Sequence, residues 1–193
     1  MPMISNNVMY KNRCRGMTLV EVLVASVIIG IGLLGVASLQ VTALQGASNA
    51  DFRSRATDLT AALADRMRAN LEGVADESYL TDAAVNCNAP PPQICAMSPD
   101  DANANGVADC TPGEMATFDL WEISCRNGVQ TSLPGGTMTV TCIDNDATDA
   151  DPCSPVSTMV VNITWQVQSD SVTPETETVV TSVVPGTHIE EDG

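Results

Sequence analysis

The sequence predicts an α+β protein in which one long N-terminal helix packs against a small antiparallel sheet. Three observations lead to this prediction. An apolar run covers residues 17–39, a helical apolar pattern continues to residue 71, and three short runs rich in Val, Thr and Ile lie near the C-terminus. Helical and strand patterns in separate parts of a chain are typical of α+β folds. We therefore expect a short basic segment at 1–16, a helix at 17–71 and a globular head at 72–193.

The run 17–39 is long and apolar enough to cross a membrane as a helix. It holds 23 residues, of which one is charged, and about 20 apolar residues suffice to span the hydrocarbon core. Three basic residues precede it, and none follows until Arg53. Because basic residues stay on the cytoplasmic side, we expect a single-pass protein with a cytoplasmic N-terminus and the head across the membrane.

Glu21 is the unusual residue of this run. A carboxylate in hydrocarbon costs roughly 2–4 kcal/mol and is usually a functional residue with a partner. No basic residue lies within helical reach of it on the apolar side. Cleavage between Gly16 and Met17 would create an α-amino group one helical turn before Glu21, where the helix dipole also favours an acid. Such a cleavage would therefore give the buried Glu21 a counter-charge, from the new amine of its own or a neighbouring chain.

Beyond residue 39 the helical pattern becomes amphipathic. Apolar residues recur at steps of three and four, which places them on one face: Phe52, Ala56, Leu59, Leu63 and Met67. Charged residues of both signs lie mostly elsewhere around the helix. Read as one helix, residues 17–71 extend about 80 Å at 1.5 Å per residue. We expect the second half to lie against the head.

The head begins with a loop and a short helix. Residues 72–113 are rich in Pro, Asn, Asp and Gly, which favour loop structure. A short helix is expected at 114–127, and its inward residues should be Met115, Phe118, Leu120, Trp121 and Cys125. A turn is expected at 133–136.

Three strands are expected after this turn, at 137–143, 157–168 and 176–184. In the second, alternate residues from Val161 to Val167 are apolar and mark one buried face. Short connections favour an antiparallel meander.

Six of the seven cysteines follow the apolar run, and only Cys14 precedes it. If the run spans a membrane, these six lie in an oxidising compartment and can form three disulfides. Cys142 and Cys153 flank the connection between the first two strands, so we expect them to pair. The pairing of the other four stays open among three possibilities: Cys87, Cys95, Cys110 and Cys125.

The charge of the head disfavours nucleic-acid binding. Residues 71–193 hold twenty acids and one base, Arg126, for a formal charge of −19, which repels phosphate backbones. The sequence contains no CxxC, HExxH, GxSxG or phosphate-loop motif, and His188 is the only histidine. We expect no enzyme activity and no catalytic residues.

One acidic segment fits the first half of a calcium-binding loop. Oxygen ligands at alternate positions, with a glycine at the sharp turn, are typical of such loops, and here they are Asp101, Asn103, Asn105, Val107 and Asp109. The bidentate Glu of the twelfth position is replaced by Pro112. We expect no cofactor apart from a candidate calcium ion at this segment, for which the alternative is a plain Asx- and Gly-rich surface turn. A second acidic loop, 144–151, has looser spacing.

The N-terminus resembles the class III leader of type IV prepilins: basic residues, Gly16, then Met17-Thr-Leu-Val-Glu21 and an aliphatic run. The resemblance implies the type IV pilin fold, cleavage after Gly16 by prepilin peptidase and N-methylation of Met17. It also implies that Glu21 guides docking into the growing fibre. Met17 departs from the commoner Phe, and the helix lacks the proline usual in major pilins.

Residues 63–70, LADRMRAN, are similar to a segment of the PilV type of minor pilin, also called type IV pilus modification protein. This resemblance implies a subunit that primes pilus assembly and enters the tip, and so supports pilus biogenesis, twitching motility and adhesion. It places the precursor in the inner membrane with a periplasmic head, and the mature subunit in the fibre. The implied partners are other minor pilins, the major pilin, a tip adhesin, prepilin peptidase and the inner-membrane assembly platform.

Three alternatives remain open. A pseudopilin of a type II secretion system has a nearly identical leader and helix. A calcium-dependent adhesive module could be carried on a pilin stalk. A plain signal anchor with a chance Glu21 would need neither a fibre nor a peptidase.

Overall fold

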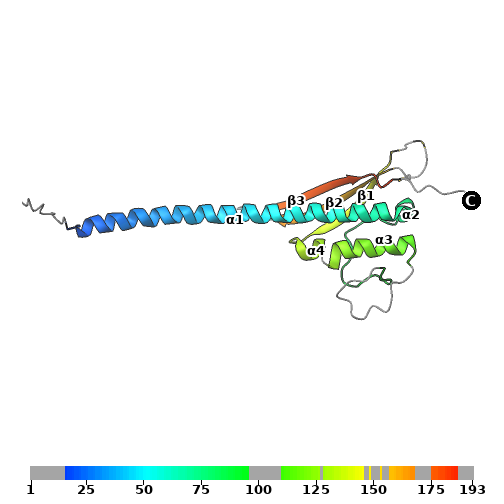
Figure 1. The fold of residues 1–193 in the computed structure, drawn as a ribbon, viewed down its shortest axis with the longest axis horizontal. Helices are drawn as coiled ribbons and strands as arrows, with labels where there is room; N and C mark the ends of the chain where they lie inside the picture. Colours follow the sequence, from blue (N-terminus) through cyan, green and yellow to red (C-terminus); the bar gives the residue numbers. More distant parts are fainter. Residues whose placement is uncertain are drawn as a thin grey trace, which may run out of the picture. The chain divides into compact units, whose positions relative to one another are not determined.

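The computed structural model describes residues 16–95, 110–126, 128–145, 148, 153, 157–167 and 175–186. Its contacts divide the chain into two compact units, residues 1–44 and 45–193, so the boundary falls within the first helix. Figure 1 shows the elements in chain order. They are α1 (Leu19–Ala69), α2 (Leu71–Ala75), α3 (Pro112–Trp121), the π-helix η1 (Glu122–Arg126), α4 (Val129–Ser132), β1 (Thr137–Ile143), β2 (Thr158–Val167) and β3 (Glu175–Val183).

Helix α1 is the element that the apolar run and the amphipathic pattern predicted. It is a single helix of 51 residues. In the first unit its large apolar side chains are exposed, from 51% at Val22 and Val36 to 77% at Leu19. Among the described residues, α1 is the one helix long and apolar enough to cross a membrane, and none of its most apolar window is buried within the protein.

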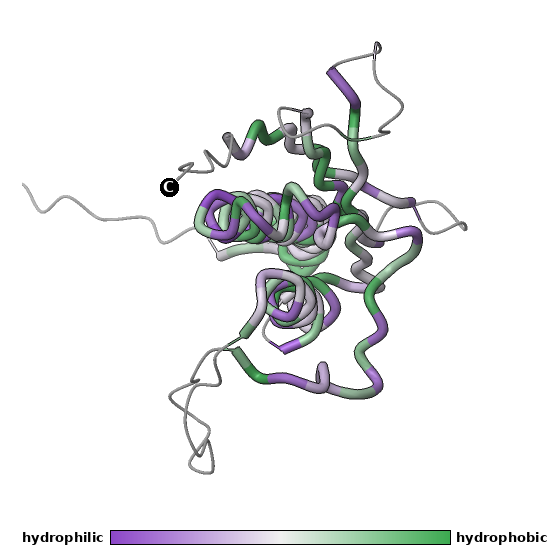
Figure 2. Tube along the Cα trace, turned by 90° about the vertical axis from the view of Figure 1, so that its right-hand side faces the viewer, coloured by the Kyte–Doolittle hydropathy of each residue, from purple (hydrophilic) through white to green (hydrophobic). Residues whose placement is uncertain are grey.

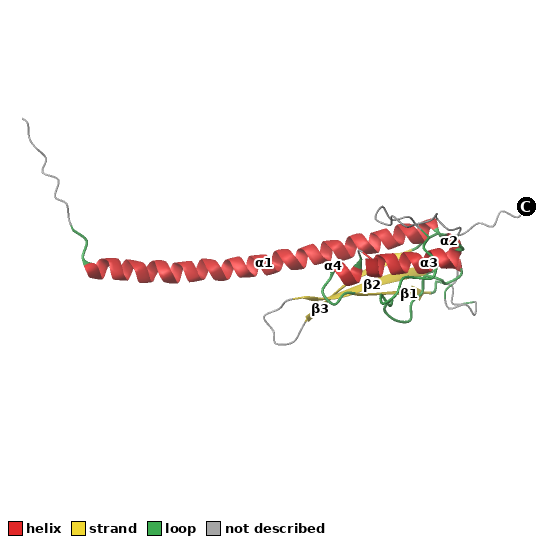
Figure 3. Cartoon of the chain, turned by 90° about the horizontal axis from the view of Figure 1, so that it is seen from below, coloured by secondary structure: helices red, strands yellow, loops and turns green. Residues whose placement is uncertain are grey.

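The second unit has two layers. The sheet is an antiparallel meander of order β1-β2-β3, as the short connections predicted. Figure 2 views the molecule at right angles to Figure 1 and shows two helices side by side on one side of the strands. Figures 1 and 3 label them α1 and α3. A long helix with a three-stranded antiparallel sheet confirms the predicted fold class.

The core lies between the two layers. Ala56, Leu63 and Met67 of α1 are completely buried and belong to one cluster with residues of the sheet and of α3. From the sheet, Ile163 is also completely buried and Trp165 is 1% exposed. These residues lie on the faces that their spacing predicted, because three- and four-residue steps align on a helix and two-residue steps align on a strand.

The chain from α2 to α4 differs from the sequence prediction in three places. Helix α3 begins at Pro112, two residues before the predicted start, because Thr111 caps it and proline is favoured at a first helical position. It continues into η1, and of its predicted inward residues Met115 and Trp121 are only partly buried. Short helix α2 forms where a loop was expected, and α4 forms between the predicted helix and the turn at 133–136, which is present. The three strands agree with prediction within one residue at each end.

Three disulfides join the second unit. The pairing expected from sequence, between Cys142 and Cys153, is present. The sequence left the pairing of the other four cysteines open, and the structure shows which of them lie together. In each of the two bridges the Cα atoms are less than 6 Å apart. These bridges are Cys87–Cys125 and Cys95–Cys110.

Candidate functional site

The N-terminal end of α1 is built around Thr18. Gly16, Met17 and Thr18 precede the helix, and the Oγ1 and carbonyl oxygens of Thr18 both accept the backbone N–H of Glu21, at 3.3 and 3.1 Å. A threonine that accepts from the third residue of the helix is an N-cap. Glu21 therefore lies in the first turn, where the positive end of the helix dipole stabilises a carboxylate.

Glu21 is the only charged residue of the first unit among residues 16–44. It is exposed, and among the described residues none forms a hydrogen bond or ion pair with its carboxylate. The side chains that follow it along the helix are large, apolar and exposed. This end of α1 is thus suited to an apolar environment, with one acid that needs a partner from outside the described chain.

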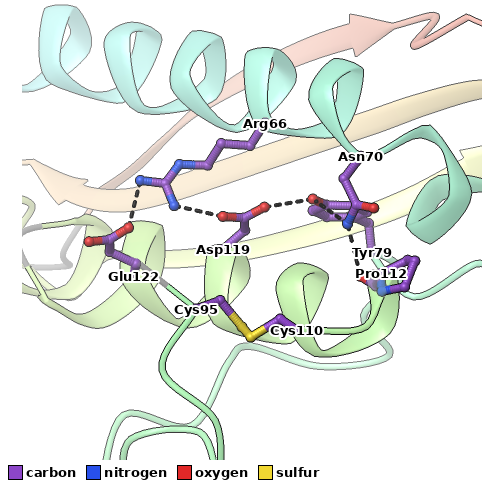
Figure 4. A network of polar contacts seen from close by, with 8 residues as sticks. All are labelled: Arg66, Asn70, Tyr79, Cys95, Cys110, Pro112, Asp119 and Glu122. Carbon is purple, nitrogen blue, oxygen red and sulfur yellow. Dashed lines mark hydrogen bonds and ion pairs between the residues drawn. A yellow bond between two sulfur atoms is a disulfide. The ribbon is translucent and has the colours of Figure 1, made fainter. Parts of the chain in front are cut away.

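A second group of polar residues joins the other end of α1 to α3 (Figure 4). Nη1 of Arg66 donates to Oδ1 of Asp119 at 2.7 Å, and Nη2 lies 2.6 Å from Oε2 of Glu122. The side chain of Asp119 is 7% exposed and that of Arg66 is 32% exposed. Burial lowers the pKa of Arg66, but its hydrogen bonds to the two carboxylates raise that pKa more.

Tyr79 and Asn70 extend this group. The hydroxyl of the completely buried Tyr79 donates to Oδ2 of Asp119 at 2.6 Å, and Nδ2 of Asn70 donates to the hydroxyl of Tyr79 and to the carbonyl of Pro112. Burial raises the pKa of the Tyr79 phenol, and the hydrogen bond to Asp119 raises it further. Oδ1 of Asn70 also caps α2 by accepting from Gly73. Both oxygens of the buried Asp119 carboxylate are therefore satisfied.

Residues 63–70, singled out in the sequence, thus have separate structural roles. Leu63 and Met67 enter the core, whereas Arg66 and Asn70 face α3. Sequence reasoning placed the charges of this segment away from the head and did not find the partners Asp119, Tyr79 and Glu122. A signal was present in Asp119, which is a carboxylate between two predicted inward residues of a helix.

The predicted calcium ligands lie outside the described residues: Asp101, Asn103, Asn105, Val107 and Asp109. Most of the looser acidic loop, 144–151, lies outside them as well. Within the described part of the chain, no group of three or more His, Cys, Asp or Glu residues is placed to hold a metal ion. Calcium binding stays a prediction.

Two family models match parts of the chain. Residues 11–37 match the prokaryotic N-terminal methylation motif, and residues 38–121 match the family described as Type IV pilin Tt1218. Over these residues the chain is similar to type IV pilins. No curated protein and no solved structure matches the chain.

The two matches cover the two groups of residues described above, except Glu122, which lies just beyond the second match. The methylation motif contains Gly16, Met17 and Glu21, and it is typical of a class III leader followed by an apolar helix. That combination fits anchoring in the inner membrane and later incorporation into a pilus. The pilin match contains Arg66 and Asp119. Type IV pilins are structural proteins, and assembly of a pilus involves other pilins and the pilus assembly machinery.

Proposed function

We propose that this protein is a minor pilin of the PilV type, which primes type IV pilus assembly and enters the fibre at its tip. The proposal depends on one observation, that Glu21, in the first turn of an exposed apolar helix directly after the Gly16–Met17 junction, has no partner within the described part of the chain. The LADRMRAN segment at 63–70 favours the minor pilin over the major pilin. In this role the protein supports pilus biogenesis, twitching motility and adhesion.

The carboxylate of Glu21 makes docking of the subunit into the fibre favourable in free energy. In the membrane its carboxylate carries an insertion cost of about 3 kcal/mol while it has no partner. Cleavage after Gly16 by prepilin peptidase and methylation of Met17 leave a cationic amine one turn away, on this subunit or the adjacent one. Pairing of amine and carboxylate between helices lowers this cost, so a subunit is more stable in the fibre than alone in lipid.

The cleavage site is tested by mass spectrometry of the protein purified from pili. The proposal expects an N-terminus at methylated Met17. An N-terminus at Met1, or one near Ser38 as after a conventional signal peptidase, would contradict it.

Docking is tested by Glu21→Ala, with Ser26→Ala as the control on the same exposed part of α1. We expect Glu21→Ala to lower the amount of this subunit in sheared pili at least tenfold, and Ser26→Ala to leave it unchanged. Normal incorporation of Glu21→Ala would show that the carboxylate does not drive docking.

The alternatives differ in what deletion of the protein removes. Loss of surface pili supports the priming role, with other minor pilins, the major pilin, a tip adhesin and the inner-membrane platform as partners. Intact pili with lost attachment would favour an adhesive module. Intact pili with lost protein secretion would favour a type II secretion pseudopilin.

A further inference from the structure

The sheet has two edge strands, β1 and β3, and the two edges differ in how their backbone groups are satisfied. In the middle of the β1 edge, the N–H of Thr81 donates to the carbonyl of Val140 at 3.0 Å, and the Oγ1 of Thr81 accepts the N–H of Val140 at 2.8 Å. The segment that carries Thr81 therefore covers the middle of this edge. Strand β3, in contrast, pairs with β2 alone, and among the described residues its outer edge has no backbone partner.

The contact between Thr81 and Val140 also identifies the backbone groups of β3 that point outward. Opposite residues of an antiparallel pair alternate between exchanging two backbone hydrogen bonds and exchanging none. Because Val140 directs its N–H and C=O to Thr81, its partner Val161 directs both groups to β3, where it faces Thr181. The outward groups of β3 therefore belong to the residues that alternate with Thr181: Thr176, Thr178, Val180 and Ser182.

Strand β3 lacks the features that usually protect an exposed edge. A proline, a lysine, a bulge or a very short strand hinders pairing with a further strand. Strand β3 is nine residues long, contains neither proline nor lysine, and keeps an unbroken register with β2. Its Val180 side chain is 58% exposed. Outward N–H and C=O groups on a regular edge strand are the groups that an extended peptide binds when it adds to a sheet.

The charged side chains of β3 restrict which peptide can add to it. Glu175 and Glu177 lie on the same side of the strand, and neither forms an ion pair with a residue that the structure describes. Residues opposite one another on neighbouring strands are about 5 Å apart, so opposite charges stabilise the pair and like charges destabilise it. A second copy of this chain is disfavoured, because residues 71–193 have a formal charge of −19. A strand with Lys or Arg at two alternate positions fits this edge.

We infer that the open edge of β3 is a docking site for an extended basic segment of another protein, which joins the sheet as a fourth strand. The backbone of this segment pairs with the four outward residues of β3. Its two basic side chains lie opposite Glu175 and Glu177, and an apolar side chain lies opposite the partly buried Val179. The backbone hydrogen bonds supply affinity, and the charge pairs select the partner. Docking at this edge is independent of the proposed priming role.

A synthetic peptide, Thr-Val-Thr-Val-Thr-Lys-Thr-Lys, tests the site on the full chain in detergent micelles. Antiparallel to β3, it places its two lysines opposite Glu177 and Glu175. Hydrogen exchange resolved to single amides should show fast exchange at Thr176, Thr178 and Val180 in the free chain, and exchange at least tenfold slower with the peptide bound. Slow exchange of these amides in the free chain, or slowing only at other residues, would overturn the inference.

The charge requirement is tested by a peptide in which Glu replaces both lysines. We expect it to bind at least tenfold more weakly than the lysine peptide, because its carboxylates lie opposite those of β3. Equal affinity of the two peptides would show that Glu175 and Glu177 do not select a basic partner.

Thr178→Pro separates pairing at the edge from general attraction to an acidic surface. Proline removes an N–H that does not pair with β2, so β3 should remain in the sheet, with slow exchange at Val179 and Thr181 as the check. We expect the affinity for the lysine peptide to fall at least tenfold in Thr178→Pro and to stay unchanged in Thr178→Ala. Equal affinity of the two variants would contradict docking at this edge.

N-methylated peptides make the same comparison without changing the protein. Methylation of the peptide threonine opposite Thr178 removes an N–H that points to β3, so binding should weaken at least tenfold. Methylation of the valine before it removes an N–H that points away from β3, so binding should be unchanged. Equal binding of both peptides would contradict strand addition even if Thr178→Pro fails to fold.

Photo-crosslinking in native membranes tests the natural partner. The amino acid p-benzoylphenylalanine replaces the exposed Val180 of the full chain, and mass spectrometry identifies the joined peptide. We expect a segment of another protein with Lys or Arg at two alternate positions, and at least tenfold less of this product when Thr178→Pro, but not Thr178→Ala, is added. Absence of a product, a product with a second copy of this chain, or a joined segment without these basic residues would overturn the inference.

Discussion

Arg66 of α1 and Asp119 of α3 form an ion pair with a separation of 2.7 Å, although they are 53 positions apart in the sequence. The pair connects the two helices that cover the sheet. Tyr79 donates to the second oxygen of the same carboxylate, so a single buried acid holds three segments of the chain together. We therefore expect substitution of Asp119 to destabilise the second unit.

Replacing Asp119 by alanine should destabilise the second unit by about 2 kcal/mol. Loss of one partner of a buried ion pair typically costs about 3–5 kcal/mol, and we expect less here because Arg66 is one-third exposed and keeps Glu122. Chemical denaturation followed by circular dichroism measures the change. Asp65→Ala, which breaks only the exposed pair with Arg68, should cost less than about 0.5 kcal/mol. Equal losses of unfolding free energy in the two variants would show that the buried pair stabilises the protein no more than the exposed pair does.

Tyr79 should ionise only at unusually high pH. Tyr10 and Tyr79 are the two tyrosines of the chain, so in a chain that begins at Met17 the absorbance of tyrosinate near 295 nm reports on Tyr79 alone. Its pKa is raised in the folded state, whereas an unfolded tyrosine titrates near pH 10. The stability that Tyr79 contributes is therefore complete below pH 10 and is lost as the pH rises toward the folded pKa. A reversible titration near pH 10 in the folded protein would be inconsistent with the buried hydrogen bond to Asp119.

The three disulfides should differ in their contribution to stability. A bridge that closes a longer loop removes more entropy from the unfolded chain. For separations of 38 and 11 residues, the loop-entropy relation gives about 3.9 kcal/mol for Cys87–Cys125 and about 2.8 kcal/mol for Cys142–Cys153. Paired Cys→Ala variants, compared by denaturant unfolding, should rank in this order. The reverse order would mean that residual structure in the unfolded chain, or strain in the native protein, affects the stabilisation more than loop length does.

The N-terminal cap of α3 should make the free energy of unfolding depend on pH in the acid range. The backbone N–H of Thr111 donates to the carboxylate of Glu114 and lowers the pKa of this group. The contribution of Glu114 is thus present above the pKa of an unfolded glutamate, near 4.3, and is lost as the pH falls through the lower folded value. Thr111→Ala should cost about 1 kcal/mol at pH 7. Glu114→Gln should flatten the dependence of stability on pH in this acid range, and an unchanged slope would exclude the cap as its source.

Calcium should bind the segment 101–109 if its pattern of oxygen ligands is functional. Titration of the full chain with calcium in a calorimeter, and thermal unfolding in millimolar calcium, measure this binding. A double substitution, Asp101→Ala with Asp109→Ala, should abolish the heat and the thermal shift. No heat from the wild-type chain would leave the segment as a surface turn.

The sequence by itself determined the features that local periodicity encodes. The apolar run, Glu21 beside the Gly16–Met17 junction, and the three strands follow from spacing along the chain, because helices and strands repeat over a few residues. Pairing of Cys142 with Cys153 also followed, since the two residues flank a connection between adjacent strands. The tertiary structure alone decided the pairing of the other four cysteines and the partners of Arg66. Each of these depends on which distant segments meet when the core forms, and a single sequence contains no periodic signal for such contacts.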